Sequence, residues 1–131
     1  MHSRHLAAAL RAARLILAAT LAPGLGATAP ACAHALLRSA DPAVGGTVSS
    51  PPGDLKLTFS ETVEPAFCRV EVTDAAGRRV DAGAPRRDPT DGKRLLVALK
   101  PLAPGVYSVT WHATSTDTHR TEGHYRFTVV P

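Results

Sequence analysis

Hydrophobic and polar residues alternate with a period near two through most of the chain beyond residue 34. This period is typical of β-strands with one buried face, and no stretch there has the pattern of an amphipathic helix. The alternation predicts seven strands, at 35–37, 55–59, 67–73, 79–82, 94–99, 106–114 and 125–129. Seven short strands divided by turn residues predict an all-β fold, a seven-stranded immunoglobulin-like Greek-key sandwich or barrel.

The segments between these strands are polar or rich in proline and glycine. Loops are predicted at 39–52 and 85–92, and the stretch 116–122 is polar. Within the strands, Trp111 alternates with other apolar residues, and so does Cys68. We expect both side chains to face the core, with Cys68 a small buried hydrophobe rather than a metal ligand or redox thiol.

The first 33 residues have a different pattern. Basic residues precede a short apolar run, Leu15 to Leu21, and Ala31-Cys32-Ala33 has the form of a signal-peptidase site. The apolar run is too short and too broken to cross about 30 Å of hydrocarbon. We therefore expect a signal peptide over 1–33, cleaved after Ala33, and a single exported domain over 34–131 with no membrane anchor. Cleavage after Ala29 and lipidation at Cys32 are the alternatives, and Pro30 argues against both.

Composition limits the function of this domain. Removing 33 of the 131 residues leaves 98, enough for one two-layer core. The formal charge of +4 falls to +1, because three arginines leave with the leader. A nucleic-acid partner is therefore not expected. Cys68 is the single thiol left, so no intramolecular disulfide can form.

Histidines supply the candidate chemistry. Cleavage after Ala33 would make His34 the N-terminal residue, whose α-amine and ring nitrogen can chelate one metal ion together. Mixed nitrogen and oxygen ligands in a plane suit Cu(II), which also has the highest intrinsic affinity among the divalent first-row ions. A second element is Asp117-Thr118-His119, because residues i and i+2 of an extended chain point to the same side.

Several motifs follow one another along the mature chain. They are His34-Ala35-Leu36-Leu37-Arg38-Ser39 followed by Asp41-Pro42-Ala43-Val44-Gly45; Leu55-Lys56-Leu57-Thr58-Phe59-Ser60-Glu61; Leu102-Ala103-Pro104-Gly105-Val106-Tyr107; and Val109-Thr110-Trp111 leading to Ser115-Thr116-Asp117-Thr118-His119 and Gly123. In this combination and order the chain resembles the CopC family of bacterial periplasmic copper-binding proteins. The family fold is a seven-stranded Greek-key barrel or sandwich, in agreement with the strand pattern.

The resemblance implies one Cu(II) site per chain, built from the amine and ring of His34, the carboxylate of Asp117 and the ring of His119. Glu61 matches a family acid beside this site that supports the N-terminal ligand. Some family members also bind Cu(I) through methionines, but Met1 is the single methionine here and it lies in the leader. We therefore expect no methionine-based Cu(I) site.

The function that follows is a periplasmic copper carrier or buffer in copper homeostasis and resistance, not an enzyme. The family also implies a possible inner-membrane copper importer of the CopD type as a partner. Two alternatives stay open: a copper-dependent oxygenase with an N-terminal histidine chelate, and a metal-free immunoglobulin-like interaction module. His112 and His124 are expected to be exposed strand residues, with adventitious metal binding between them if they pair across strands.

Overall fold

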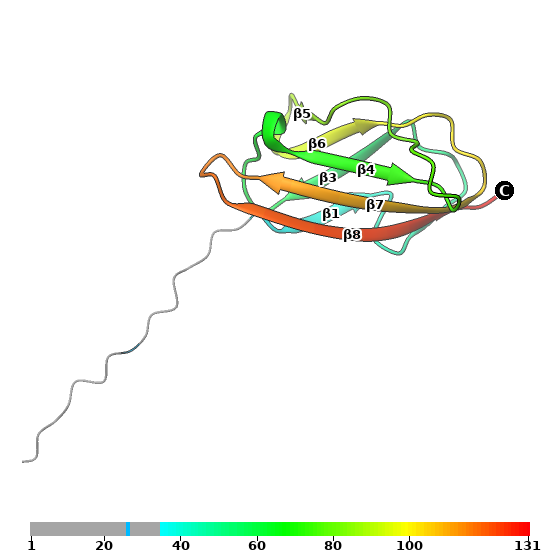
Figure 1. Cartoon of the computed structure of the whole chain (residues 1–131), viewed down its shortest axis with the longest axis horizontal. Coiled ribbons are helices and arrows are strands. Elements are labelled where there is room, and N and C mark those ends of the chain that lie inside the picture. Colours follow the sequence, from blue (N-terminus) through cyan, green and yellow to red (C-terminus); the bar gives the residue numbers. More distant parts are fainter. Residues whose placement is uncertain (1–25, 27–34) are drawn as a thin grey trace, which may run out of the picture. The chain divides into compact units, whose positions relative to one another are not determined.

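The computed structural model describes Gly26 and residues 35–131. The rest of the expected leader lies outside the described residues, and so does His34. The described domain is a sandwich of two four-stranded sheets (Figure 1). One sheet has the order β1 (Leu37–Asp41), β3 (Asp54–Phe59), β6 (Asp91–Ala98) and β5 (Arg86–Asp88). The other has the order β2 (Thr47–Val48), β8 (Arg120–Val129), β7 (Gly105–Thr114) and β4 (Arg69–Thr73).

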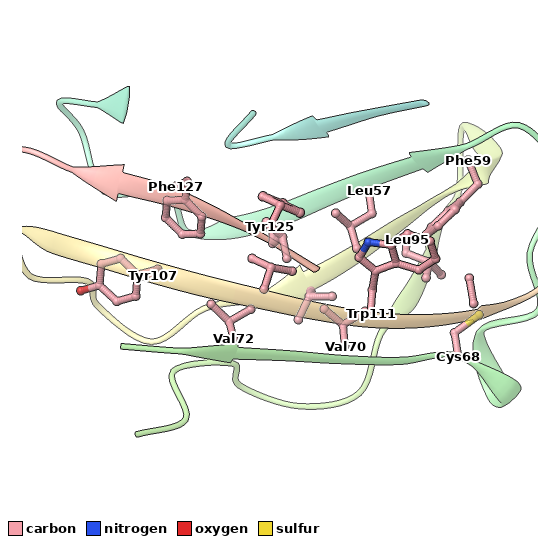
Figure 2. Close-up of a cluster of buried hydrophobic side chains, with 14 of the residues drawn as sticks. Leu57, Phe59, Cys68, Val70, Val72, Leu95, Tyr107, Trp111, Tyr125 and Phe127 are labelled. Carbon is pink, nitrogen blue, oxygen red and sulfur yellow. The ribbon is translucent and has the colours of Figure 1, made fainter. Parts of the chain in front are cut away.

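The core lies between the sheets and is formed by alternate residues of the strands (Figure 2). From the first sheet come Leu55, Leu57, Phe59, Leu95 and Val97, and from the second Val70, Val72, Tyr107, Val109, Trp111, Ala113, Tyr125, Phe127 and Val129. Cys68 is buried beside them, as expected. Burying these apolar faces against each other removes them from water, which is the main force that holds two sheets together.

Trp111 links the two sheets near one end of the core. Its ring meets Phe59 edge to face, with centroids 5.3 Å apart. Trp111 lies opposite Gly123 in the β7–β8 ladder, and a Cβ at residue 123 would lie 2.6 Å from the indole. A glycine is therefore needed on β8 for the indole to pack against that strand.

The all-β, two-sheet class predicted from the sequence is confirmed, but residues 35–131 hold eight strands instead of seven. The two additional strands, β2 and β5, lie in segments predicted as loops. Each has only two or three residues and lies at a sheet edge, where one neighbouring strand suffices. Such short edges leave no alternating pattern in the sequence.

The predicted strand at 79–82 is wrong, because this segment divides its hydrogen bonds between both sheets. Val80 donates its N–H to Val72 of β4, whereas Ala82 donates to Ala98 of β6. The Asp81 carboxylate is 6% exposed and accepts the Val72 N–H as well as two guanidinium N–H groups of Arg79. Burial alone would raise the pKa of Asp81, but these hydrogen bonds outweigh it and lower the pKa.

Other predicted boundaries also shift, and β6 begins at Asp91, inside the predicted loop 85–92. The first strand runs over 37–41 rather than 35–37, and β8 begins at Arg120, inside the stretch expected to be merely polar. β4 begins at Arg69 because a 3-10 turn, η1 (Pro65–Phe67), precedes it. Pro65 opens this turn and favours its backbone angles, which leaves Phe67 71% exposed.

Candidate metal centre

Asp117 and His119 lie in the turn that joins β7 to β8. This turn is at the end of the sandwich that also holds η1 and is opposite the C-terminus (Figure 1). Two backbone hydrogen bonds close it, from the Ser115 N–H to the His119 carbonyl and from the Thr118 N–H to the Ser115 carbonyl, both 2.9 Å. Thr118 has a φ of 73°, in the left-handed region that favours glycine. Five residues therefore form a compact reversal.

The two predicted ligand side chains meet in this turn. His119 Nδ1 lies 3.1 Å from Asp117 Oδ2, and both side chains are about half exposed. The geometry assumed for the pair was wrong, because the chain is not extended here. The left-handed Thr118 between them reverses the chain, and it is this reversal that brings the carboxylate and the ring together.

Ser115 is the residue of this centre that the sequence analysis missed. It is 2% exposed, and its hydroxyl donates a hydrogen bond to Asp117 Oδ1. That bond, helped by the neighbouring His119 and opposed by partial desolvation, lowers the pKa of Asp117. Ser115 thus fixes one carboxylate oxygen of Asp117, and the other oxygen faces His119. The sequence signal was a serine two residues before an aspartate at the end of a strand.

The start of the described domain is fixed close to this turn. Ala35 is fully buried, and its carbonyl accepts a hydrogen bond of 2.6 Å from the Thr121 hydroxyl, at the beginning of β8. Leu36 exchanges two bonds with Ser60: its N–H reaches the Ser60 hydroxyl at 2.9 Å, and its carbonyl accepts the Ser60 N–H at 2.8 Å. Ala35, the residue after His34, is therefore bonded to Thr121, which lies two positions after His119 in the chain.

Glu61 lies on the segment that crosses from β3 to the second sheet. Its predecessor Ser60 bonds to Leu36, and its successor Thr62 accepts the Thr116 N–H at 3.0 Å. The two chain neighbours of Glu61 are therefore hydrogen-bonded to the start of the domain and to the β7–β8 turn. Its side chain is partly exposed. His34 lies outside the described residues, so the expected role of Glu61 beside it stays a prediction.

Within residues 35–131, no group of three or more histidine, cysteine, aspartate or glutamate side chains is arranged to hold a metal ion. The pair at 117 and 119 supplies one oxygen and one nitrogen 3.1 Å apart. Two adjacent ligands, each about 2.0 Å from one ion at a right angle, are about 2.8 Å apart. The pair is therefore spaced like two neighbouring ligands of one ion, and a complete site would need further ligands.

The other candidate residues lie elsewhere. His112 and His124 are on the outer face of the β7–β8 hairpin, as expected, with His112 Nε2 3.1 Å from Glu122 Oε2. The buried Cys68 thiol donates to the Glu64 carbonyl at 3.1 Å, and burial raises its pKa. A thiol held in its protonated form by burial is a poor metal ligand. No helix in 35–131 has the length and apolar character that crossing a bilayer requires.

Comparison with known proteins shows which family this domain resembles. A family model described as "CopC domain" matches residues 37–130. Protein YobA of Escherichia coli K12 is 39% identical over 98 residues, which cover 74% of this chain and 79% of that protein.

Solved structures of CopC and PcoC share the fold. CopC from Methylosinus trichosporium OB3b superposes with a TM-score of 0.70 at 33% identity, covering 75% of this chain and 95% of that one. PcoC, described as a methionine-rich copper resistance protein from Escherichia coli, gives a TM-score of 0.66 at 32% identity over 74% and 99% of the two chains. The family match spans most of this chain and agrees with the observed two-sheet fold. The chain belongs to the CopC family.

Proposed function

We propose that this protein binds one Cu(II) ion with high affinity and acts as an exported copper carrier or buffer. The ligands are the α-amine and ring of His34, the carboxylate of Asp117 and the ring of His119. Membership of the CopC family supports copper as the cargo, because PcoC, with the same fold, is described as a copper resistance protein. The observation that carries the proposal is the meeting of Asp117 and His119 in one turn.

The place of Ala35 supports the N-terminal ligand. Hydrogen bonds from Thr121 and to Ser60 fix the chain at Ala35 and Leu36 beside the start of β8. A ligand attached directly before Ala35 starts from a fixed point close to the β7–β8 turn. Cleavage after Ala33 would give that ligand a free amine, so its affinity for Cu(II) depends on processing. The partly exposed Glu61 would orient the terminal group, as residues behind metal ligands commonly do.

The donor set favours the cupric ion. An amine, two imidazoles and a carboxylate are borderline to hard ligands, which suit Cu(II), whereas Cu(I) prefers thioether and thiolate sulfur. PcoC is described as rich in methionine, but this chain has Met1 alone, in its expected leader. Cys68 is buried among carbonyl groups. The protein would therefore hold copper in one oxidation state and pass it on without a second, sulfur-based site.

The same ligands favour a copper carrier over a copper-dependent enzyme. The Asp117 carboxylate would supply a copper ligand where an oxygenase keeps a position open for oxygen. Tyr107, Trp111 and Tyr125 are buried, and the exposed Phe67 alone is too small to form a flat surface for a polysaccharide. An exported carrier needs an acceptor, and an inner-membrane importer of the CopD type is the partner that we propose.

The decisive experiment compares two proteins in a Cu(II) titration: one beginning at His34, and one with a single alanine added before His34. Mass analysis of the exported protein establishes which N-terminus the cell produces. We expect the extension to weaken Cu(II) binding about 100-fold or more, because the free amine moves away from the ring. Equal affinities would exclude the N-terminal ligand. Absence of binding in both proteins would instead favour a metal-free interaction module.

A second experiment separates carriage from oxygenase activity. The copper-loaded protein is incubated with a reductant, oxygen and a polysaccharide, and the sugars are analysed by mass spectrometry. We expect no oxidised products. Their formation, and their loss in His119→Ala, would replace the carrier proposal with an enzymatic one.

A further inference from the structure

The outer face of the β7–β8 hairpin gathers metal-ligating side chains away from the centre just described. Trp111, Ala113 and Tyr125 point inward and are buried. Residues between them in the two strands must point outward, since side chains of a strand alternate between its faces. His112, Glu122 and His124 therefore lie on one outer face.

The strand register brings these three residues together. His112 is paired with Glu122, and His124 is paired with Thr110, so His124 is the diagonal neighbour of His112. Directly opposite residues have Cβ atoms about 5 Å apart and diagonal ones about 7 Å, within reach of long side chains. His112 Nε2 already lies 3.1 Å from Glu122 Oε2. Residues Thr110, His112, Glu122, Gly123 and His124 line one shallow groove on this face.

We propose that His112, Glu122 and His124 form a second, weaker Cu(II) site on this face. Two imidazole nitrogens and one carboxylate oxygen are a donor set that divalent first-row ions bind, and copper binds it more strongly than the other divalent ions of the series. Glu122 and His124 are two residues apart on β8, and His112 comes from the adjacent strand. The ion would bridge the two strands over Gly123, whose lack of a side chain leaves the inward face to Trp111.

Two features explain why this site would be weaker than the first. The three side chains do not converge in residues 35–131, so rotation of the exposed His124 and Glu122 side chains must accompany binding. Arg69 of β4 is paired with His112 on its other side and is exposed on the same face. Its positive charge on this face would repel a bound cation. Arg69 therefore lowers the affinity of the site.

The test is a titration of the mature protein, beginning at His34, with two equivalents of Cu(II). Calorimetry in a non-coordinating buffer measures the affinities, and paramagnetic broadening of backbone amides locates each ion. The variants are His112→Gln, His124→Gln and the double variant. Arg126→Ala is the matched control, since Arg126 is the next outward residue on β8 after His124 and has no ligand atom of this type.

We expect the second equivalent to broaden the amides of 110–112 and 122–124. Its affinity should fall about tenfold in each single variant and be lost in the double variant, with Arg126→Ala unchanged. Arg69→Gln should strengthen it severalfold, an effect that loss of folding would not produce. A missing second equivalent, or one unaffected by the double variant, would overturn the inference. The first equivalent reports separately on His34, Asp117 and His119, so failure of either site is recognised on its own.

Discussion

Two turns of this domain have the same backbone conformation, but their aspartates have different roles. In the turn 74–78, the Asp74 N–H bonds to the Arg78 carbonyl at 2.9 Å, and the Gly77 N–H bonds to the Asp74 carbonyl at 3.0 Å. The turn 115–119 repeats both bonds one for one, with Ser115 at the first position. The fourth residue is left-handed in each: Gly77 has a φ of 79° and Thr118 a φ of 73°.

The position of the aspartate distinguishes the two turns. Asp74 is the first residue of its turn, and its Oδ1 accepts the N–H groups of Ala76 and Arg78, each at 2.9 Å. Asp117 is the third residue of its turn, where it meets the Ser115 hydroxyl and the His119 ring. An acid at the first position thus completes the backbone of the turn. An aspartate two residues later in the turn points toward the side chain of the fifth residue, so the two side chains can bind one metal ion together.

Removing the acid or the imidazole from the second turn should have the largest effect. We expect Asp117→Ala and His119→Ala each to weaken Cu(II) binding about 100-fold, because each removes one of the proposed copper ligands. Thermal stability should change little, since both side chains are about half exposed. Calorimetric titration and a melting curve of each variant measure the two effects. His112→Ala is the control and should leave the first equivalent unchanged; full-affinity binding by His119→Ala would contradict the assignment.

Ser115→Ala tests how the second turn holds its acid. Asp117 loses the hydroxyl that fixes one of its oxygens, so we expect Cu(II) affinity to fall about tenfold, in the range known for residues behind metal ligands. Ser115→Thr keeps the hydroxyl and should restore much of the affinity. If alanine and threonine bind copper equally well, the Ser115 hydroxyl does not position Asp117.

Asp74→Ala is the mirror experiment on the first turn. A hydrogen bond from the Arg78 N–H lowers the pKa of Asp74, and a hydrogen bond from the Ala76 N–H lowers it further by a smaller amount. A pKa below that of the unfolded chain, about 3.9, means that the carboxylate stabilises the fold above that pH, and the effect is lost as the pH falls through the folded value. We expect a melting temperature lower by a few degrees at pH 7, a smaller difference near pH 3, and unchanged copper affinity. A loss of copper binding would show that the turns are not independent.

Thr118→Gly should have the smallest effect. Thr118 is a β-branched residue in a left-handed conformation, which costs about 1 kcal/mol, whereas glycine takes the equivalent place in the first turn. Part of that gain is offset by the greater freedom of glycine in the unfolded chain. We expect a net stabilisation of roughly 0.5 kcal/mol by chemical denaturation, with copper affinity within twofold. Destabilisation would indicate that the threonine side chain has a role of its own.

The sequence predicted what depends on local pattern. Alternation located the central strands, including the inward-facing Trp111, because a strand buried on one face must repeat every two residues. It failed at 79–82, where the chain passes from one sheet to the other and its hydrogen-bond partners are set by tertiary packing. It also found Asp117 and His119 while assuming an extended chain, since a left-handed threonine has no signature in the sequence.

The anchoring of Ala35 has a consequence for the speed and cost of metal capture. The bond from Thr121 holds the chain one residue away from the proposed terminal ligand. A tether of one residue gives that ligand a high effective concentration at the turn, and each added residue would dilute it. The entropy of bringing a chain end to the site is lost when the domain folds, not when copper arrives. Folding, in this protein, would do the ordering that in a flexible chelator the metal has to do itself.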